Sequence, residues 1–171
     1  SFAMYPIVAR GMGALPVPVP LDAKLCHDLD AMADAISDAT KLVFVCNPNN
    51  PTGTMTSRAE IARLHAGLRP DILFVLDQAY AEYLEPEEVD GGFELAARAE
   101  NVLVTRTFSK IFGLAGERIG WATGAPGLID VVNRIRGPFN VTGAAQAGAL
   151  AALGDQDFVR RSREENSRVR A

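Results

Sequence analysis

A lysine at position 110 stands among residues whose types suit covalent chemistry. Lys110 follows Thr107 and Ser109, and Arg118 comes eight positions after it. Bulky apolar residues also flank the lysine: Phe108, Ile111, Phe112 and Leu114. Because apolar surroundings penalise a cation, we expect the amine to be neutral part of the time and able to form a Schiff base with an aldehyde. Two hydroxyls and the fork-shaped guanidinium of Arg118 are the components of a phosphate site.

Three further polar residues follow buried apolar runs. Asp77 comes directly after Ile72–Leu76, Tyr80 lies three residues later, and Asn50 lies in the loop "NPNNPTG" after Leu42–Cys46. The Asp77 carboxylate can pair with a protonated pyridine nitrogen, and that pairing makes the ring a strong electron sink. Asn50 and Tyr80 can hydrogen-bond an oxygen on the same ring. An aldehyde, a phosphate and a pyridine together describe pyridoxal 5′-phosphate.

The elements that position these residues are indicated by apolar periodicity, which alternates between buried strands and amphipathic helices. The predicted strands are Leu42–Cys46, Ile72–Leu76, Val102–Thr105 and Ile119–Gly124, with a Pro-rich edge strand at Leu15–Leu21. The predicted helices lie around Leu25–Ile36, from a capping box at Ser57 and Glu60 to Leu68, at Phe93–Ala99, Pro126–Ile135, Thr142–Gly154 and Phe158–Arg170. This alternation predicts an α/β fold with a mostly parallel sheet and helices on both faces.

Ligands of such sheets bind at the carboxyl ends of the strands. The three unusual loops "NPNNPTG", "DQAYAEY" and "RTFSK" each follow a predicted strand. We therefore expect the polar residues of all three loops to meet at one edge of the sheet.

The same three segments, in this order and spacing, resemble the fold type I pyridoxal-phosphate aminotransferases. "TFSKIFGLAGERIG" carries much of the likeness, while "SFAMYPIVARGMGA" and "RGPFNVTGAAQ" are most similar to the histidinol-phosphate aminotransferase subfamily. The resemblance runs over nearly the whole chain. It implies a three-layer αβα large domain in residues 1–155, incomplete at its N-terminus. Residues 156–171 would begin a helix that leads to a small C-terminal domain.

The resemblance also implies three catalytic residues. Lys110 is the lysine that binds the cofactor covalently and moves the proton between two carbons during transamination. Asp77 pairs with the pyridine nitrogen. Tyr80 holds the ring oxygen and lowers the pKa of the cofactor–lysine linkage.

The remaining cofactor contacts follow from the same motifs. Asn50 shares the ring oxygen with Tyr80, and Thr107, Ser109 and Arg118 bind the phosphate. Phe2 matches the position whose aromatic ring stacks on the cofactor. No metal site is implied.

The implied activity is amino-group transfer between histidinol phosphate and 2-oxoglutarate in histidine biosynthesis, by a cytoplasmic homodimer. Two alternatives of the same fold stay open: an aromatic amino-acid aminotransferase and a decarboxylase of a phosphorylated amino acid. A third, from another class, is the ligand-sensing domain of a transcription regulator. The residues named above serve the cofactor, which these enzymes share, and so they do not separate the substrates.

The composition of the chain argues against some classes of binding partner. The net charge is −4 without a basic excess, which argues against nucleic acid or an anionic membrane as a partner. Apolar runs are too short to cross a bilayer, and the two cysteines form no CxxC pair. The family's other phosphate contacts, its partner-reaching segment and its small domain are not found. We therefore expect exposed apolar surface in part of the Gly137–Val141 region and on the first predicted helix. Either the chain is a piece of a longer polypeptide, or the isolated chain associates and binds cofactor weakly.

Overall fold

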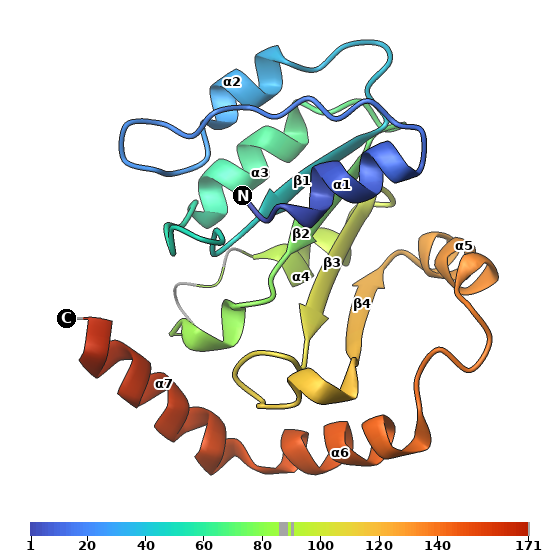
Figure 1. Cartoon of the computed structure of the whole chain (residues 1–171). Helices are drawn as coiled ribbons and strands as arrows, with labels where there is room; N and C mark the ends of the chain where they lie inside the picture. Colours follow the sequence, from blue (N-terminus) through green and yellow to red (C-terminus); the bar gives the residue numbers. More distant parts are fainter. Residues whose placement is uncertain (86–88, 90, 171) are drawn as a thin grey trace.

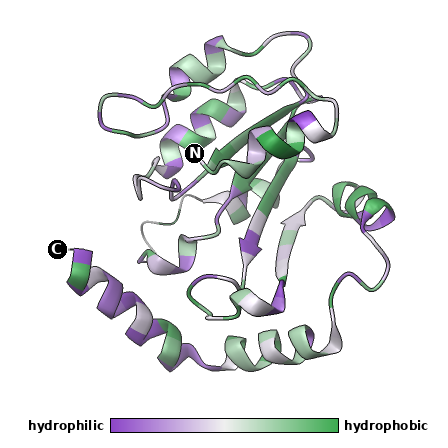
Figure 2. Ribbon diagram, viewed as in Figure 1, coloured by the Kyte–Doolittle hydropathy of each residue, from purple (hydrophilic) through white to green (hydrophobic). Residues whose placement is uncertain are grey.

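The computed structural model describes residues 1–85, 89 and 91–170, and its centre is a single sheet (Figure 1). The strands lie in the order β1 (Leu42–Cys46), β2 (Leu73–Asp77), β3 (Val102–Thr107) and β4 (Gly120–Gly124). The first three strands are parallel, and β4 is antiparallel to β3. Figure 2 shows that β1 is hydrophobic along most of its length, although Leu42 and Phe44 on one face are 41% and 39% exposed. The predicted mostly parallel α/β sheet is confirmed.

The bounds of β2 and β3 differ from the sequence expectation in ways that affect the site, and β4 begins one residue later than predicted. β2 is shifted by one residue, so Asp77 is its last residue and is in register with Cys46 on β1 and Thr105 on β3. β3 continues two residues beyond the prediction because β4 pairs with it there. Arg106 is opposite Trp121, and Thr107 is opposite Gly120.

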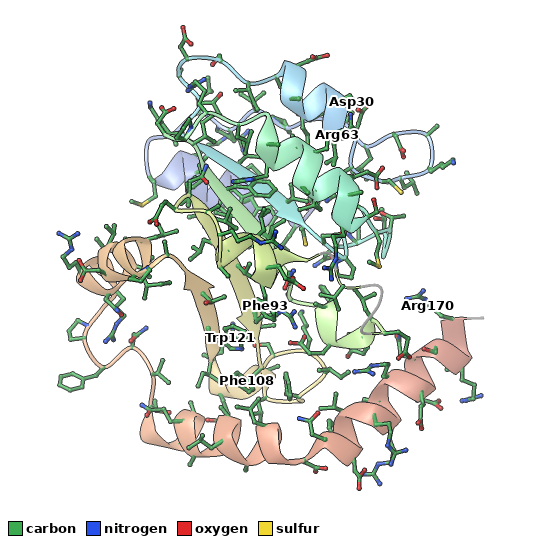
Figure 3. All side chains as sticks on the ribbon, turned by 180° about the vertical axis from the view of Figure 1, so that it is seen from behind. Asp30, Arg63, Phe93, Phe108, Trp121 and Arg170 are labelled. Carbon is green, nitrogen blue, oxygen red and sulfur yellow. The ribbon has the colours of Figure 1, made fainter. Side chains whose placement is uncertain are left out.

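Helices cover both faces of the sheet, as the front view of Figure 1 and the back view of Figure 3 show. α1 lies on one face, and α3 and α4 lie on the other. The helices are α1 (Met4–Gly11), α2 (Leu29–Asp34), α3 (Arg58–Ala66), α4 (Gly92–Ala96), α5 (Pro126–Ile135), α6 (Gly143–Gly154) and α7 (Gln156–Arg170), with short 3₁₀ turns η1 (Ala81–Tyr83) and η3 (Ala115–Glu117). Ser57 and Glu60 form the predicted capping box at the start of α3. The boundary between residues 155 and 156 stays a prediction.

The N-terminal region departs most from the sequence expectations. The edge strand predicted at Leu15–Leu21 is wrong: the segment contains only an isolated bridge from Leu21, and its alternating prolines lack the backbone donors that a ladder needs. The helix expected around Leu25–Ile36 begins only at Leu29. Asp28 caps it by accepting a hydrogen bond from the backbone of Ala31 at 2.9 Å, while Leu25 has a left-handed φ of 63°. α1 was not predicted as a helix.

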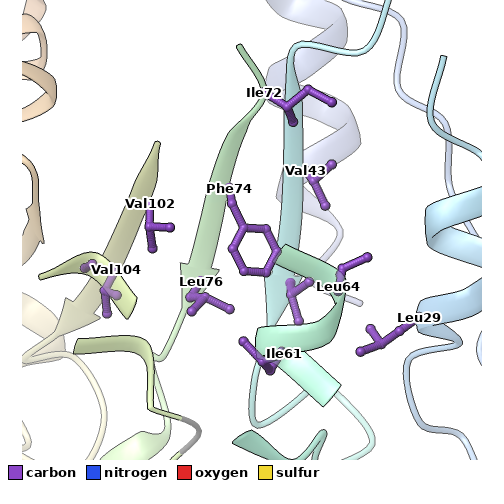
Figure 4. Packing of buried hydrophobic residues seen from close by; sticks show 11 residues of the cluster. Leu29, Val43, Ile61, Leu64, Ile72, Phe74, Leu76, Val102 and Val104 are labelled. Carbon is purple, nitrogen blue, oxygen red and sulfur yellow. The ribbon is translucent and has the colours of Figure 1, made fainter. Parts of the chain in front are cut away.

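The core fills the space between the sheet and α3. Side chains of alternate strand residues point to this face, where Phe74 and Leu76 are fully buried against Ile61 and Leu64 of α3 (Figure 4). Leu29 of α2 closes the cluster and is 6% exposed. Burying each such side chain contributes about 1.5–3 kcal/mol to stability, which makes this half of the sheet the rigid support of the site.

Apolar exposure is found at one of the two expected places. Phe139, within the Gly137–Val141 region, is 97% exposed. The first predicted helix is different, because Leu29 is buried and Met32 packs against the core. Apolar side chains are instead exposed on other helices: Ile7 and Val8 on α1, Ile135 on α5 and Leu150 on α6 are each more than half exposed. No helix in the described part of the chain is long and apolar enough to cross a membrane.

α7 carries charged side chains that form ion pairs along the helix. Arg160 lies 3.3 Å from Glu164. Glu165 pairs with Arg168 at 2.6 Å. In both cases the side chains are largely exposed, so each pair contributes little to stability.

Substituting Gly120 is expected to strain the junction between β3 and β4. A Cβ at this position would lie 2.7 Å from the carbonyl oxygen of Arg106, which is backbone and cannot turn aside. We expect Gly120→Ala to lower the free energy of unfolding by about 1–3 kcal/mol. Gly127→Ala is the matched control, because no atom lies within 4 Å of the added Cβ there. Urea denaturation of both variants checks this, and equal stabilities would contradict the close approach.

Candidate functional site

Asp77 lies at the carboxyl end of the central parallel strands, where the ligand site was predicted. Its Oδ1 accepts a hydrogen bond from the backbone N–H of Ala79 at 3.1 Å. Its Oδ2 accepts a hydrogen bond from the hydroxyl of Tyr5 at 2.5 Å. Both carboxylate oxygens are therefore fixed by donors, and each keeps a lone pair for a further partner.

Tyr5 is a site residue that sequence reasoning missed. Its ring stacks on Phe44 of β1, with centroids 4.9 Å apart, and the edge of the Phe2 ring lies against it at 5.7 Å. Burial and the hydrogen bond to Asp77 raise the pKa of the Tyr5 hydroxyl, so it stays protonated and donates. No local pattern marks Tyr5, because its partner Asp77 is 72 positions away in the sequence.

Asn50, Tyr80 and Lys110 form a second contact group. Asn50 Nδ2 lies 3.5 Å from the Tyr80 hydroxyl, and the Lys110 ammonium lies 5.0 Å from the centroid of the Tyr80 ring. The three side chains come from the segments that follow β1, β2 and β3 respectively. The loop that carries Asn50 is held by its neighbour Asn47, whose amide bonds both the N–H and the C=O of Thr56 at 2.9 Å.

Thr107, Ser109 and Arg118 form the third group. Thr107 Oγ1 accepts a hydrogen bond from the backbone N–H of Ser109 at 3.0 Å, and Arg118 Nη1 donates to Ser109 Oγ at 3.3 Å. Arg118 has left-handed backbone angles, φ 52° and ψ 45°. For a residue with a side chain this conformation costs about 1–2 kcal/mol, and such strain is concentrated at functional sites.

Two cations at this edge have no acidic partner within the described residues. Neither Lys110 nor Arg118 forms an ion pair there, and Asp130, the acidic residue twelve positions after Arg118, pairs with Arg134 at 3.2 Å. An amine and a guanidinium without carboxylates suit an aldehyde that carries a phosphate. No cluster of metal-binding side chains is found among the residues that the structure describes.

The expected desolvation of Lys110 is wrong for the described residues. Phe108 and Ile111 are buried, with 4% and 3% of their surfaces exposed, but Lys110 itself is exposed. Phe108 and Ile111 point into the protein while the lysine points outward, toward the ring of Tyr80. The described residues therefore supply the cation–π contact but not the apolar enclosure.

Removing the Tyr5 hydroxyl is expected to destabilise the site without disturbing the stack on Phe44. Tyr5→Phe deletes a hydrogen bond to a carboxylate, and we expect the free energy of unfolding to fall by about 1–2 kcal/mol. Tyr83→Phe is the control, because the Tyr83 hydroxyl forms no hydrogen bond with a described residue. Urea denaturation measures both, and a neutral Tyr5→Phe would show that Asp77 does not depend on this donor.

Comparison with known proteins identifies a family whose enzymes act on amino groups, as the geometry of the site suggests. Residues 1–171 match the family model for aminotransferase class I and II. The histidinol-phosphate aminotransferase of Erythrobacter litoralis is 66% identical over 168 residues, which are 98% of this chain and 46% of that protein. That of Sphingopyxis alaskensis is 58% identical over 171 residues, which are 100% of this chain and 46% of that protein.

A solved structure shows the same fold. The histidinol-phosphate aminotransferase of Sinorhizobium meliloti, in complex with pyridoxal-5′-phosphate, is 32% identical to this chain with a TM-score of 0.91. The match covers 99% of this chain and 46% of that one, so the chain spans about half the length of the relatives it matches. These likenesses confirm the resemblance and the predicted fold. The chain belongs to the aminotransferase class I and II family.

Proposed function

We propose that the polypeptide containing this chain is a pyridoxal-phosphate-dependent aminotransferase that exchanges an amino group between histidinol phosphate and 2-oxoglutarate. One observation carries the proposal: an amine, a carboxylate and an anion-binding arginine stand at the carboxyl edge of one sheet, on Lys110, Asp77 and Arg118. The high identity to histidinol-phosphate aminotransferases supports the choice of substrate.

The side chains fit pyridoxal phosphate at each of its functional groups. Arg118, Ser109 and Thr107 would bind the phosphate, and their polar groups are already linked by hydrogen bonds. Asp77 offers a carboxylate to a ring nitrogen, held by Tyr5. When bound, the cofactor supplies an aldehyde for amine exchange and a ring that takes up electron density from the substrate carbon.

Lys110 and Tyr80 perform the proton chemistry in this proposal. Lys110 Nζ would hold the cofactor through its aldehyde carbon. When free, the same amine would accept the proton from the substrate α-carbon and deliver it to that former aldehyde carbon. Asn50 Nδ2 donates to the Tyr80 hydroxyl at 3.5 Å, and with the cofactor bound both groups would donate to the ring oxygen. Asp77 would keep the ring nitrogen protonated, and this would stabilise the charge that forms when the proton leaves.

Phe2 is proposed to stack on the cofactor ring. It stands beside Tyr5, with 42% of its surface exposed, and so has a free face for such a contact. Homodimeric assembly and a cytoplasmic location belong to the same proposal. They rest on the relatives' biosynthetic role and on exposed apolar side chains such as Phe139.

A substrate comparison tests the proposal. The intact polypeptide, loaded with pyridoxal phosphate, is assayed for amino-group transfer to 2-oxoglutarate from histidinol phosphate, phenylalanine and tyrosine. We expect kcat/KM for histidinol phosphate to exceed the others by about a hundredfold or more, because a site built for a charged group discriminates strongly against ligands that lack it. Faster reaction with the aromatic amino acids would assign the rival aminotransferase activity. Cofactor binding without any turnover would favour a ligand sensor.

A further inference from the structure

Arg106 occupies the face of the sheet opposite Asp77, directly before the residues of the anion site. Its Nε donates to Gln78 Oε1 at 2.9 Å, and its Nη1 donates to Glu82 Oε1 at 2.7 Å. Gln78 and Glu82 are the residues two before and two after Tyr80. One guanidinium on β3 therefore holds both sides of the turn that carries Tyr80.

This contact is buried, unlike most ion pairs of the described chain. The side chains of Arg106 and Glu82 are 8% and 15% exposed, whereas Arg63 and Asp30 on the surface are 62% and 77% exposed. The second carboxylate oxygen of Glu82 is buried and has no hydrogen-bond partner among the described residues. Desolvation strengthens the charge-assisted bond and makes the loss of either partner costly.

Aromatic rings fix the guanidinium from its other side. Arg106 Cζ lies 4.6 Å from the centroid of the Phe93 ring of α4. Phe93 in turn stacks on Trp121 of β4, with centroids 5.7 Å apart, and Figure 3 shows the two rings side by side. The guanidinium of Arg106 thus lies between the Phe93 ring and the turn that carries Tyr80, and these contacts fix its orientation.

A residue of α7 also hydrogen-bonds the turn that carries Tyr80. Arg163 Nε donates to the backbone carbonyl of Glu82 at 3.0 Å, and its Nη1 lies 3.6 Å from Glu85. This contact joins residues 81 positions apart in the sequence. It approaches η1 from outside the sheet, while Arg106 approaches from β3.

We propose that Arg106 is a positioning residue that locks the Tyr80 turn to β3, and so holds the Tyr80 phenol against Lys110. The catalytic part of this inference rests on the proposed function. Arg106 lies on β3, four residues before Lys110, and it hydrogen-bonds the side chains of Gln78 and Glu82 on both sides of Tyr80. The 5.0 Å contact between the Lys110 ammonium and the Tyr80 ring is therefore set by a residue that touches neither the amine nor the phenol.

Hydrogen exchange without cofactor tests the lock itself. The reporters are the amides of Ala81, Tyr83 and Leu84, which bond within the turn. In the intact polypeptide we expect Arg106→Met to speed their exchange about tenfold or more, since a charge-assisted buried bond is lost. Arg106→Lys keeps the charge but lacks the fork, so it is expected to show an intermediate effect and remains informative if the methionine variant does not fold. The matched control is Arg63→Met, which breaks a surface pair and should leave these amides unchanged (Figure 3).

A double-mutant cycle tests whether the lock acts through Tyr80. With bound pyridoxal phosphate, the pH midpoint of its visible absorbance is expected to rise by about one unit in Tyr80→Phe, because a donor to the ring oxygen is lost. Arg106→Lys is expected to shift the midpoint in the same direction, and the double variant should shift it no further than Tyr80→Phe.

The outcomes separate this inference from the proposed function. Additive shifts, or unchanged exchange of the turn in both Arg106 variants, would overturn the positioning role. A wild-type polypeptide that binds no pyridoxal phosphate would refute the proposed function, and hydrogen exchange would still decide whether Arg106 locks the turn.

Discussion

Lys110→Ala is expected to reduce amino-group transfer by at least about three orders of magnitude while cofactor is still bound non-covalently. Binding should persist because Asp77, Asn50 and Arg118 keep their contacts. Turnover should be lost because no other base of the described chain is placed to move the proton. Both histidines are engaged elsewhere: His27 Nε2 with the carbonyl of Cys46 at 2.9 Å, and His65 Nε2 with Asn101 at 3.0 Å.

Single-turnover kinetics with histidinol phosphate measures this loss, and dialysis followed by absorbance measures cofactor retention. Lys41→Ala is the matched control, because Lys41 forms an exposed pair with Asp71 at 2.9 Å, away from the site. Its turnover should equal that of the wild type. A Lys110→Ala protein that kept a tenth of the wild-type rate would remove Lys110 from the proposed chemistry.

Asp77→Asn is expected to slow removal of the substrate α-proton by about a hundred- to a thousandfold, with the fold preserved. The amide has the shape of the carboxylate and can still accept the Tyr5 hydrogen bond, but it lacks the charge that keeps the ring nitrogen protonated. The effect should therefore appear in the proton-transfer step more than in cofactor binding.

Exchange of the substrate α-hydrogen with deuterated water isolates that step. Asp130→Asn supplies the control, since Asp130 forms only an exposed pair with Arg134. A near-normal exchange rate in Asp77→Asn would show that another group handles the ring nitrogen.

The positions of site residues that directly follow a parallel strand could be predicted from the sequence. Continuous apolar runs located the parallel strands, and the rule for carboxyl ends then placed Asn50, Asp77 and Thr107 at one edge. β3 was predicted too short because its last two residues are defined by pairing with β4, and pairing partners do not appear in local periodicity. The antiparallel direction of β4 was hidden for the same reason.

Contacts between distant residues were not predictable. Tyr5 and Asp77 are 72 positions apart, and Arg106 reaches Gln78 and Glu82 from another strand. Neither pair has a spacing that a periodic pattern could reveal. The exposure of Lys110 was misjudged because apolar neighbours indicate only that a segment is buried, and not which way the intervening side chain points.

Covalent labelling tests the central claim most directly. The intact polypeptide is incubated with pyridoxal phosphate, reduced with borohydride and digested, and the peptides are mapped by mass spectrometry. The proposed function predicts a pyridoxyl group fixed on Lys110 Nζ, with the label absent from Lys110→Ala. Label on Lys24, Lys41 or any other lysine, or no label at all, would contradict the assignment of this site.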